Sequence, residues 1–355
     1  MNDQKRKRVL IIQSQIPHYR IPIFNELSKT LDLTVVYDKG DVPADTKFDT
    51  KKIELKHIKR IPKIHKKNIL RMAKKYDVVI SMLDGSYMTT HLLCYFRRKT
   101  KLILWGIGVA ASYKVRYDAS QEEADGFRRL IQKADAALFY SQYPVDKYAQ
   151  MGVPVEKMFV ANNTVQVLPA ENTEKEHILF VGSLYKAKKI FELLKCYEKA
   201  CESTPTVPKL VIVGDGEDGY DVRRWIAEKG MEDKILLTGA IYDEAKIAEL
   251  FSRAIVCISP DQAGLTVLQS FGYGVPFVTH KNAITGGERH NIVNGTNGVL
   301  LDSFDEMTTV LRECAENAEE YLTMGRNAKT FYEENRTVKH MVNGFLDAIA
   351  YVSEG

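Results

Sequence analysis

Two polar side chains, eight positions apart, flank the predicted start of a short helix in the second half of the chain. Asp261 lies in a Ser-Pro-Asp turn that follows the β-branched run 254–258, and Gln269 lies about one turn inside the helix. The first backbone N–H groups of such a helix have no intrahelical partner, and the helix dipole favours an anion there. These N–H groups belong to Gly264, Leu265 and Thr266. The pattern is typical of a phosphate or diphosphate site, although a plain βαβ unit with solvated polar residues has the same spacing.

A glycine turn followed by lysines is a second candidate for phosphate binding. Gly182 follows the apolar run 177–181, and Lys188 lies near the start of a helix that is predicted to continue through Phe191 and Leu194. Backbone amides and a cation at a helix start can hold a phosphate, while solvated lysines beside a turn are equally common.

Such residues need a scaffold in which several strands end at one edge. Apolar runs alternate with helical segments along the whole chain, which indicates parallel sheets wound with helices. The predicted strands are 9–13, 33–37, 77–81, 101–105, 136–140, 177–181, 209–213, 235–237, 254–258 and 276–279. The pattern restarts after a polar linker near 162–176, so we expect an α/β protein of two Rossmann-like domains, 1–165 and 166–337. Apolar residues at helical spacing predict a last helix at about 338–355.

The loop after the first strand is the best candidate for an acceptor side. His18, Tyr19 and Arg20 follow that strand, and Gly106 follows a later one. Open α/β sheets bind ligands at the carboxyl ends of their strands. The alternative is a packed loop in which the tyrosine and arginine have structural roles.

Composition excludes several classes of protein. The 355 residues are 45% hydrophobic and 27% charged, which is ordinary for a soluble enzyme, and no apolar run approaches the ~20 residues of a membrane span. The start of the chain does not resemble a signal peptide, so we expect a cytoplasmic protein. Five scattered cysteines without a C-x-x-C pair argue against a zinc site or disulfide framework, and we expect no metal or other cofactor.

Charge is shared unevenly between the two halves. Residues 1–165 hold 30 Lys+Arg and 17 Asp+Glu, a net +13, which leaves 20 and 29, or −9, for the rest. Much of the excess lies in residues 51–75, where solvated faces are the simplest explanation and an anionic membrane surface is the partner that we consider. We expect no nucleic-acid partner.

The stretch 259–279 resembles the nucleotide-sugar signature of the family-4 retaining glycosyltransferases, members of glycosyl transferases group 1 with the GT-B fold. That signature has two glutamates around a Gly-aromatic-Gly and a Leu, followed by Gly-x-Pro. Asp261 stands at the first glutamate, Gln269 at the second, and Gly274-Val-Pro276 closes the motif. The resemblance implies two Rossmann-like domains that face each other across a cleft, with the last helix crossing back to the first domain.

Other segments extend the resemblance along the chain. Lys188 matches the lysine of a family segment that binds the donor diphosphate, whereas Ser183 replaces its arginine. Gly214-Asp-Gly216 resembles the turn at the edge of the nucleotide pocket, and Gly239-Ala-Ile241 resembles the segment whose main chain holds the base. Glu288 stands at a family glutamate, and Ile107 at a place where many relatives carry a histidine.

The resemblance implies a site residue by residue. Lys188 and Asp261 are the implied catalytic residues. The implied donor-binding residues are Gly182, Ser183, Lys188, Gly214, Asp215, Ala240, Ile241, Asp261, Gln262, Ala263, Gly264, Leu265, Thr266 and Gln269. His18, Tyr19, Arg20 and Gly106 are expected on the acceptor side.

The expected function is transfer of a sugar from a UDP- or GDP-linked donor to a glycan or a lipid-linked glycan during cell-surface polysaccharide synthesis. Fixed cations and N–H groups would stabilise the leaving diphosphate, so no metal is needed. Two alternatives remain open. Asp261, Gln269 and Ser183 depart from the family pattern, which allows a non-catalytic sugar-nucleotide or glycan-binding protein. The segment 106–111 also fits the G-x-G-x-x-A loop of a dinucleotide-dependent oxidoreductase.

Overall fold

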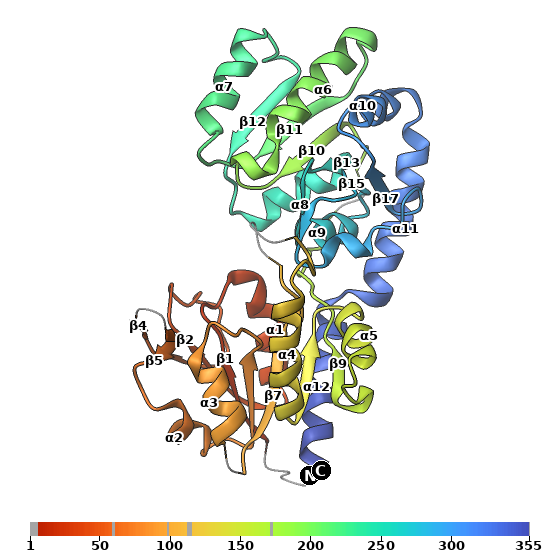
Figure 1. The fold of residues 1–355 in the computed structure, drawn as a ribbon. Coiled ribbons are helices and arrows are strands. Elements are labelled where there is room, and N and C mark those ends of the chain that lie inside the picture. The colour runs from red at the N-terminus through yellow and green to blue at the C-terminus, as the bar shows by residue number, and fades with distance from the viewer. Residues whose placement is uncertain (1–5, 59–60, 98, 112–115, 171–172, 355) are drawn as a thin grey trace. The chain divides into compact units, whose positions relative to one another are not determined.

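The chain forms two compact α/β units. The structure is a computed structural model that describes residues 6–58, 61–97, 99–111, 116–170 and 173–354 (Figure 1). The first unit contains the chain up to Ala111, Tyr117–Val165 and everything from Thr337 on. The second contains Gln166–Arg336 together with Arg116. Each unit has its own parallel sheet and core, as expected for two Rossmann-like domains.

A seven-stranded parallel sheet forms the centre of the first unit, in the order β3-β2-β1-β6-β7-β8-β9. Its strands are β1 (Arg8–Ile12), β2 (Asp32–Tyr37), β3 (Asp49–Lys52), β6 (Val78–Met82), β7 (Lys101–Gly106), β8 (Ala136–Phe139) and β9 (Met158–Val160). The sheet grows in both directions from β1, because Leu10 pairs with Thr34 of β2 on one side and with Val79 of β6 on the other. The junction of β1 and β6 is therefore a topological switch point.

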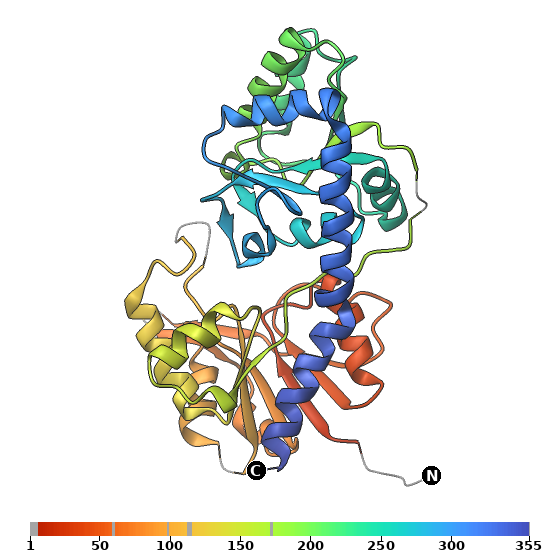
Figure 2. The same ribbon diagram turned by 90° about the vertical axis from the view of Figure 1, so that its right-hand side faces the viewer.

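Helices cover both faces of this sheet. α1 (Ile21–Ser28) and α12 (Val338–Glu354) pack on one face, and Figure 2 shows α12 lying over the strands. The ring of Phe345 from α12 meets that of Trp105 edge to face at 4.7 Å between centroids. The other face carries α2 (Ile69–Ala73), α3 (Met88–Phe96), α4 (Gln121–Lys133) and α5 (Tyr143–Gln150).

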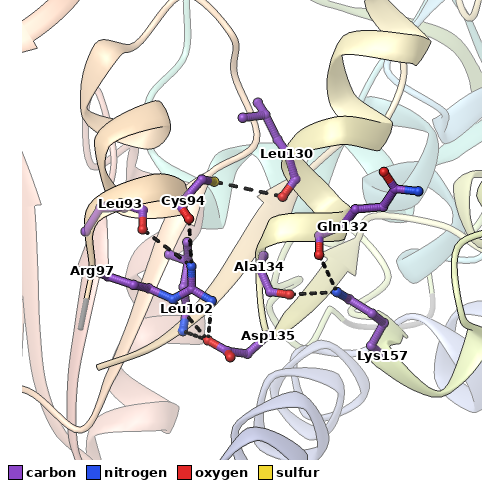
Figure 3. Close-up of polar contacts among 9 residues, drawn as sticks. All are labelled: Leu93, Cys94, Arg97, Leu102, Leu130, Gln132, Ala134, Asp135 and Lys157. Carbon is purple, nitrogen blue, oxygen red and sulfur yellow. Dashed lines mark hydrogen bonds and ion pairs between the residues drawn. The ribbon is translucent and has the colours of Figure 1, made fainter. Parts of the chain in front are cut away.

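Two cations close the carboxyl ends of α3 and α4 (Figure 3). Arg97 donates to the Cys94 carbonyl at 3.1 Å and to the Asp135 carboxylate at 2.9 Å. Lys157 donates to the Ala134 carbonyl at 2.6 Å. Because the last carbonyls of a helix lack intrahelical partners, these contacts fix both helix ends against the start of the sheet.

The basic segment 51–75 contains strands that we did not expect. β4 (Leu55–Ile58) and β5 (Ile61–His65) form an antiparallel hairpin between β3 and α2. Lys59 and Arg60 lie outside the described residues. The remaining lysines of the segment are spread over β3, the hairpin and the region of α2, and one of them, Lys66, pairs with Glu54.

The second unit repeats the strand order of the first, as β12-β11-β10-β13-β15-β17. Its strands are β10 (His177–Val181), β11 (Lys209–Val213), β12 (Ile235–Gly239), β13 (Ala254–Ile258), β15 (Phe277–His280) and β17 (Gly298–Leu301). β10, β11 and β13 have the predicted bounds, because each is a largely buried, mostly apolar run ended by a turn. The switch point lies between β10 and β13.

Helices again cover both faces. One face carries α6 (Ile190–Ser203), α7 (Gly219–Glu228) and α10 (Glu306–Glu316), and the other α8 (Glu244–Ser252), α9 (Thr266–Gly272) and α11 (Ala318–Asn335). Two short strands, β14 (Gln262–Ala263) and β16 (Ile284–Thr285), pair beside this sheet. The 3-10 helices are η1 (His18–Arg20), η2 (Val155–Lys157), η3 (Lys186–Lys188) and η4 (Glu288–Asn291). Every helix in the described ranges is too short or too polar to span a bilayer.

Candidate functional site

The donor-site residues that the sequence predicts gather at the carboxyl edge of the second sheet. Gly182 follows β10, Gly214 follows β11 and Asp261 follows β13. These three strands are neighbours, and the switch point between β10 and β13 is where open α/β sheets bind ligands. Segments that lie up to 80 positions apart in the sequence thus share one edge within a single unit.

The turns after β10 and β11 pack backbone against backbone. The Leu184 N–H donates to the Asp215 carbonyl at 2.9 Å. A Cβ on Gly214 would come within 1.9 Å of the Gly182 carbonyl oxygen, and a Cβ on Gly216 within 2.3 Å of the Leu184 carbonyl oxygen. Only glycine fits at these two positions, so the Gly-Asp-Gly turn holds the Gly182 turn in place.

Lys188 is a buried cation in this edge. It is 9% exposed, and its ammonium group makes no hydrogen bond or ion pair with any residue that the structure describes. The amine lies against the Gly182 turn, since a Cβ on Gly182 would meet Lys188 Nζ at 3.0 Å. Burial lowers the pKa of Lys188 to about 8. Because buried charges are normally paired, this arrangement favours an anionic ligand.

The chain bends sharply around Lys188. It ends the 3-10 turn η3, and Lys189 has a left-handed backbone with a φ of 55° before α6 begins. We expected a helix directly after the glycine turn. The bend turns the Lys188 side chain inward, while Ser183, Lys186 and Lys189 are exposed. Lys186 and Lys189 are therefore exposed cations within six positions of Ser183, which stands at the place of the family arginine.

A hydrogen bond joins the turns after β10 and β13. Tyr185 Oη donates to Gln262 Oε1 at 2.7 Å across the switch point. Asp261 is half-buried, and burial raises the pKa of its carboxyl group, whereas His280, Lys189 and Arg116 act in the opposite direction. A carboxylate next to cations and a fixed amide can hold sugar hydroxyls.

The helix after this turn begins later than we predicted. α9 begins at Thr266 instead of Gly264, and its first bonds run from the Val267 N–H to the Gly264 carbonyl and from the Gln269 N–H to the Leu265 carbonyl, both at 3.0 Å. The N–H groups of residues 264–266 precede these bonds. Gln269 is partly exposed one turn inside, and Ala263 is buried below it in the core.

The segment after β12 joins the same edge through its backbone. The Gly214 N–H donates to the Gly239 carbonyl at 2.9 Å. Ala240 is exposed, and Ile241 is partly buried against the α8 and α9 face. The backbone of these two residues thus lies next to the Gly-Asp-Gly turn.

Two buried polar residues near the site have surroundings that the sequence did not reveal. Glu288 is 7% exposed and accepts from the Gly286 N–H at 3.0 Å, so it fixes the turn after β16 instead of lying on the surface. Ser259, directly after β13, is 1% exposed and its hydroxyl has no partner in the described residues. The residue types alone do not indicate that Glu288 and Ser259 are buried.

The acceptor-side residues of the first unit fall into two environments. His18 is exposed and Tyr19 partly exposed in η1, after β1. Arg20 is 3% exposed, with its guanidinium 5.2 Å from the Trp105 ring centroid and Nη1 3.3 Å from Met341 Sδ. Our expectation that Arg20 faces an acceptor conflicts with this burial, which gives it a packing role between the sheet and α12.

Packing explains the glycines that suggested a dinucleotide loop. Gly106 ends β7, and Gly108 has a φ of 85°. A Cβ on Gly108 would lie 2.6 Å from the Phe139 ring and 2.7 Å from Pro144. Tyr148 Oη also donates to the Gly108 carbonyl at 2.5 Å. The glycine spacing here therefore reflects a close contact with β8 and α5 and is no evidence for an oxidoreductase.

Comparisons with known proteins agree with this geometry. Residues 166–331 match the family model of glycosyl transferases group 1. The trehalose synthase of Thermococcus litoralis is 24% identical over 326 residues, which cover 82% of this chain and 75% of that protein. The Vi polysaccharide biosynthesis protein VipC/TviE of Salmonella typhi is 25% identical over 149 residues, which cover 40% of this chain and 25% of that protein.

A solved structure gives the fold over the whole chain. Anabaena HepE in complex with UDP superimposes with a TM-score of 0.71 at 14% identity, covering 97% of this chain and 99% of HepE. Two parallel sheets of Rossmann order, one in each unit, are the architecture of the GT-B fold. Residues 166–331, which make up most of the second unit, are the part of the chain that matches glycosyl transferases group 1. This confirms the predicted resemblance, whereas membership of family 4 stays a prediction.

Proposed function

We propose that this protein is a metal-independent, retaining glycosyltransferase of cell-surface polysaccharide synthesis. It transfers a sugar from a UDP- or GDP-linked donor to a glycan or a lipid-linked glycan. The observation that carries the proposal is the buried ammonium of Lys188 against the Gly182 turn, at the switch point of the group 1 unit.

Charge builds on the diphosphate as its bond to the anomeric carbon breaks. Lys188 is buried in a site of low dielectric, where a fixed cation stabilises that charge more than it could in water. The N–H groups of residues 264–266 add oriented dipoles. Together they supply the electrophilic assistance that a divalent metal would otherwise give.

The resemblance to the glycosyltransferase family assigns the remaining donor contacts. Asp261 and the backbone of Gln262 and Ala263 hold the sugar hydroxyls, and Gln269 holds the ribose. Ala240 and Ile241 contact the base through their main chain, so the side chains here do not record whether the base is uracil or guanine. Retention follows from attack on the face that the leaving group departs from, with the donor phosphate taking the proton of the acceptor.

Comparisons support parts of this proposal. HepE was solved with UDP and with UDP-glucose, which favours a UDP-linked donor here. The match to a Vi polysaccharide biosynthesis protein favours a role in surface polysaccharides.

We also propose that the protein works in the cytoplasm and binds the membrane surface reversibly through its basic first unit. The sequence favoured residues 51–75 for this contact. A second surface supports it as well, since Tyr95 and Phe96 at the end of α3 are 54% and 66% exposed. Lys133 lies 5.8 Å from the Tyr95 ring centroid, and Lys99 is exposed nearby in sequence. Aromatic rings with neighbouring cations are typical of contacts with anionic lipid.

A second candidate is a sugar-nucleotide-binding protein with little turnover. Asp261 and Gln269 favour it, because each replaces a glutamate of the signature. Both candidates bind nucleotide, and only the enzyme cleaves the donor.

Two measurements, made one after the other, test the proposal. A thermal-shift screen against UDP- and GDP-sugars should raise the melting temperature with donors of one base, because a ligand that binds only the folded state stabilises it. Release of free UDP or GDP from that donor should then be detectable, with water as a slow acceptor. Binding without release favours the binding protein, and absence of binding to all donors contradicts both candidates.

A further inference from the structure

Ser259 carries a buried hydroxyl that the fold does not use. The residue is 1% exposed, and Ser259 Oγ has no hydrogen-bond partner among the described residues. A buried hydroxyl without a partner costs free energy, so such groups are uncommon unless a ligand or water completes them. Its backbone is fixed, since the Ser259 N–H donates to the Val278 carbonyl at 3.0 Å.

Strand register places this hydroxyl beside the Gly182 turn. β10 and β13 are parallel neighbours, and Leu179 pairs with Cys257. Extending this register by two residues along each chain sets Ser259 opposite Val181, one position before Gly182. Paired strands lie about 4.8 Å apart, so Ser259 is next to the turn that Lys188 Nζ touches.

The alternation of side chains along a strand indicates which face of the sheet the Ser259 side chain is on. Residues 257 and 259 point to the same side of the sheet because their strand continues through the Val278 contact. Cys257 is on the face packed by α8 and α9, and it interacts electrostatically with Lys188. Ser259 Oγ therefore lies on the side of the sheet that α8 and α9 cover, and closer than Cys257 to the carboxyl edge where Lys188 lies against the Gly182 turn.

We propose that Ser259 is a donor-binding residue that donates a hydrogen bond to the terminal phosphate of the nucleoside diphosphate, beside Lys188. The inference rests on the proposed function and assigns the phosphate contact to a residue outside the motif matches. A single phosphate oxygen would satisfy both the unpaired ammonium and the unpaired hydroxyl.

The test compares diphosphate with monophosphate. Isothermal titration would measure UDP, UMP, GDP and GMP binding to the full chain as wild type, Ser259→Ala and Ser259→Thr. The matched control is Ser270→Ala, because Ser270 is also buried on this face but donates to the Val275 carbonyl at 2.8 Å. Thermal melts of each variant without nucleotide would complete the set.

For Ser259→Ala we expect a loss of about tenfold or more in affinity for the diphosphate of the preferred base, as for a lost hydrogen bond to a charged group. Monophosphate affinity should stay within about twofold, Ser259→Thr should restore binding, and the melting temperature should not fall. Ser270→Ala should leave the ratio of diphosphate to monophosphate affinity unchanged.

Three results would overturn the inference. Equal losses of diphosphate and monophosphate affinity would show a general disturbance of the site. A large fall in the melting temperature of Ser259→Ala would assign the hydroxyl to the fold. Unchanged diphosphate affinity would mean that water alone satisfies Ser259. If the wild type binds neither UDP nor GDP, the proposed function fails first, and that failure is recognisable without any variant.

Discussion

The two sheets share one strand order and end in different chemistry. In the second unit, glycine turns follow β10 and β11 at the switch point, and the Lys188 ammonium beside them has no partner among the residues that the structure describes. At the corresponding edge of the first unit, large side chains fill the space, and Arg20 lies between the rings of Trp105 and Tyr140. One scaffold therefore supports a buried cation without a partner among the described residues in one copy and a packed edge in the other.

The buried cations of the two units, Arg20 and Lys188, have different roles. The Arg20 guanidinium is satisfied by aromatic faces and contributes to the core. Lys188 has no such partner in the described residues, so its burial lowers stability in exchange for a site that attracts anions. Removing the two cations should consequently have opposite effects on stability.

The largest expected effect is on turnover in Lys188→Met. Loss of a fixed charge at the leaving group should lower kcat/KM by about 100-fold or more. The pKa of Lys188 falls from its ordinary 10.5 to about 8, which corresponds to about 3 kcal/mol of unfavourable free energy at pH 7. The variant should therefore melt at the same or a higher temperature than wild type.

Arg20→Met is the matched variant in the first unit. It should lower the melting temperature, because the guanidinium stacks on buried rings, while nucleotide affinity stays unchanged. Wild-type turnover in Lys188→Met, or weaker nucleotide binding in Arg20→Met, would contradict the division of roles.

Donor binding should depend on pH through Lys188. The free protein loses the ammonium charge above about pH 8, so the Kd for the nucleoside diphosphate should rise by up to about tenfold per pH unit above that value. The free energy of unfolding should instead rise as the pH increases. The depressed pKa penalises folding fully below about pH 8, and the penalty fades as pH rises towards 10.5.

Titrations of nucleotide and thermal melts between pH 7 and 10 would measure both trends. Lys188→Met serves as the control and should lack them. A Kd that stays constant from pH 7 to 10 in wild type would exclude Lys188 as the phosphate cation.

The next prediction is that the basic first unit binds anionic membranes. Sedimentation with vesicles containing anionic lipid at low and high salt should show binding that salt weakens. One variant changes Lys59, Arg60, Lys63, Lys66 and Lys67 to Gln, and the other is Tyr95→Ser with Phe96→Ser. A variant on the true contact surface should lose about tenfold in partitioning.

The control changes two exposed tyrosines of the acidic unit, Tyr220→Ser with Tyr242→Ser, which are 74% and 90% exposed in wild type. It should sediment like wild type. If the wild-type protein fails to sediment with the vesicles at low salt, the proposed membrane binding is wrong.

The smallest expected effect is that of Gln269→Glu, which restores the family residue. If the side chain accepts from ribose hydroxyls, a carboxylate should keep or improve donor affinity, by about threefold at most. If the amide donates to a phosphate, the new charge should weaken binding by about 1–3 kcal/mol. We expect the first result in a donor titration, and a large rise in donor Kd would overturn the ribose role.

Sequence patterns predicted what depends on local chemistry. β10, β11 and β13 are short, largely apolar runs, so their bounds were predictable, and Gly182, Gly214 and Lys188 belong to recognisable turns. Pairing with a neighbour creates other elements, such as β9 with three residues and β14 with two, and single-chain periodicity cannot reveal these.

Side-chain environment was harder to predict than position. Arg20 contacts Met341, which is 321 positions away, so its burial depends on where α12 packs. Glu288 and Ser259 are also buried, although neither residue type indicates burial. The motif positions thus predicted which edge of the sheet carries the site. The structure shows which polar groups at that edge have no partner among the described residues.

The most direct test of the central claim is hydrogen–deuterium exchange of the full chain with and without UDP or GDP. The account predicts that nucleotide slows exchange in peptides covering 182–189, 214–216 and 259–269, around the Lys188 edge of the second sheet. Protection confined to the loop 106–111 of the first unit, or no protection with either nucleotide, would contradict it.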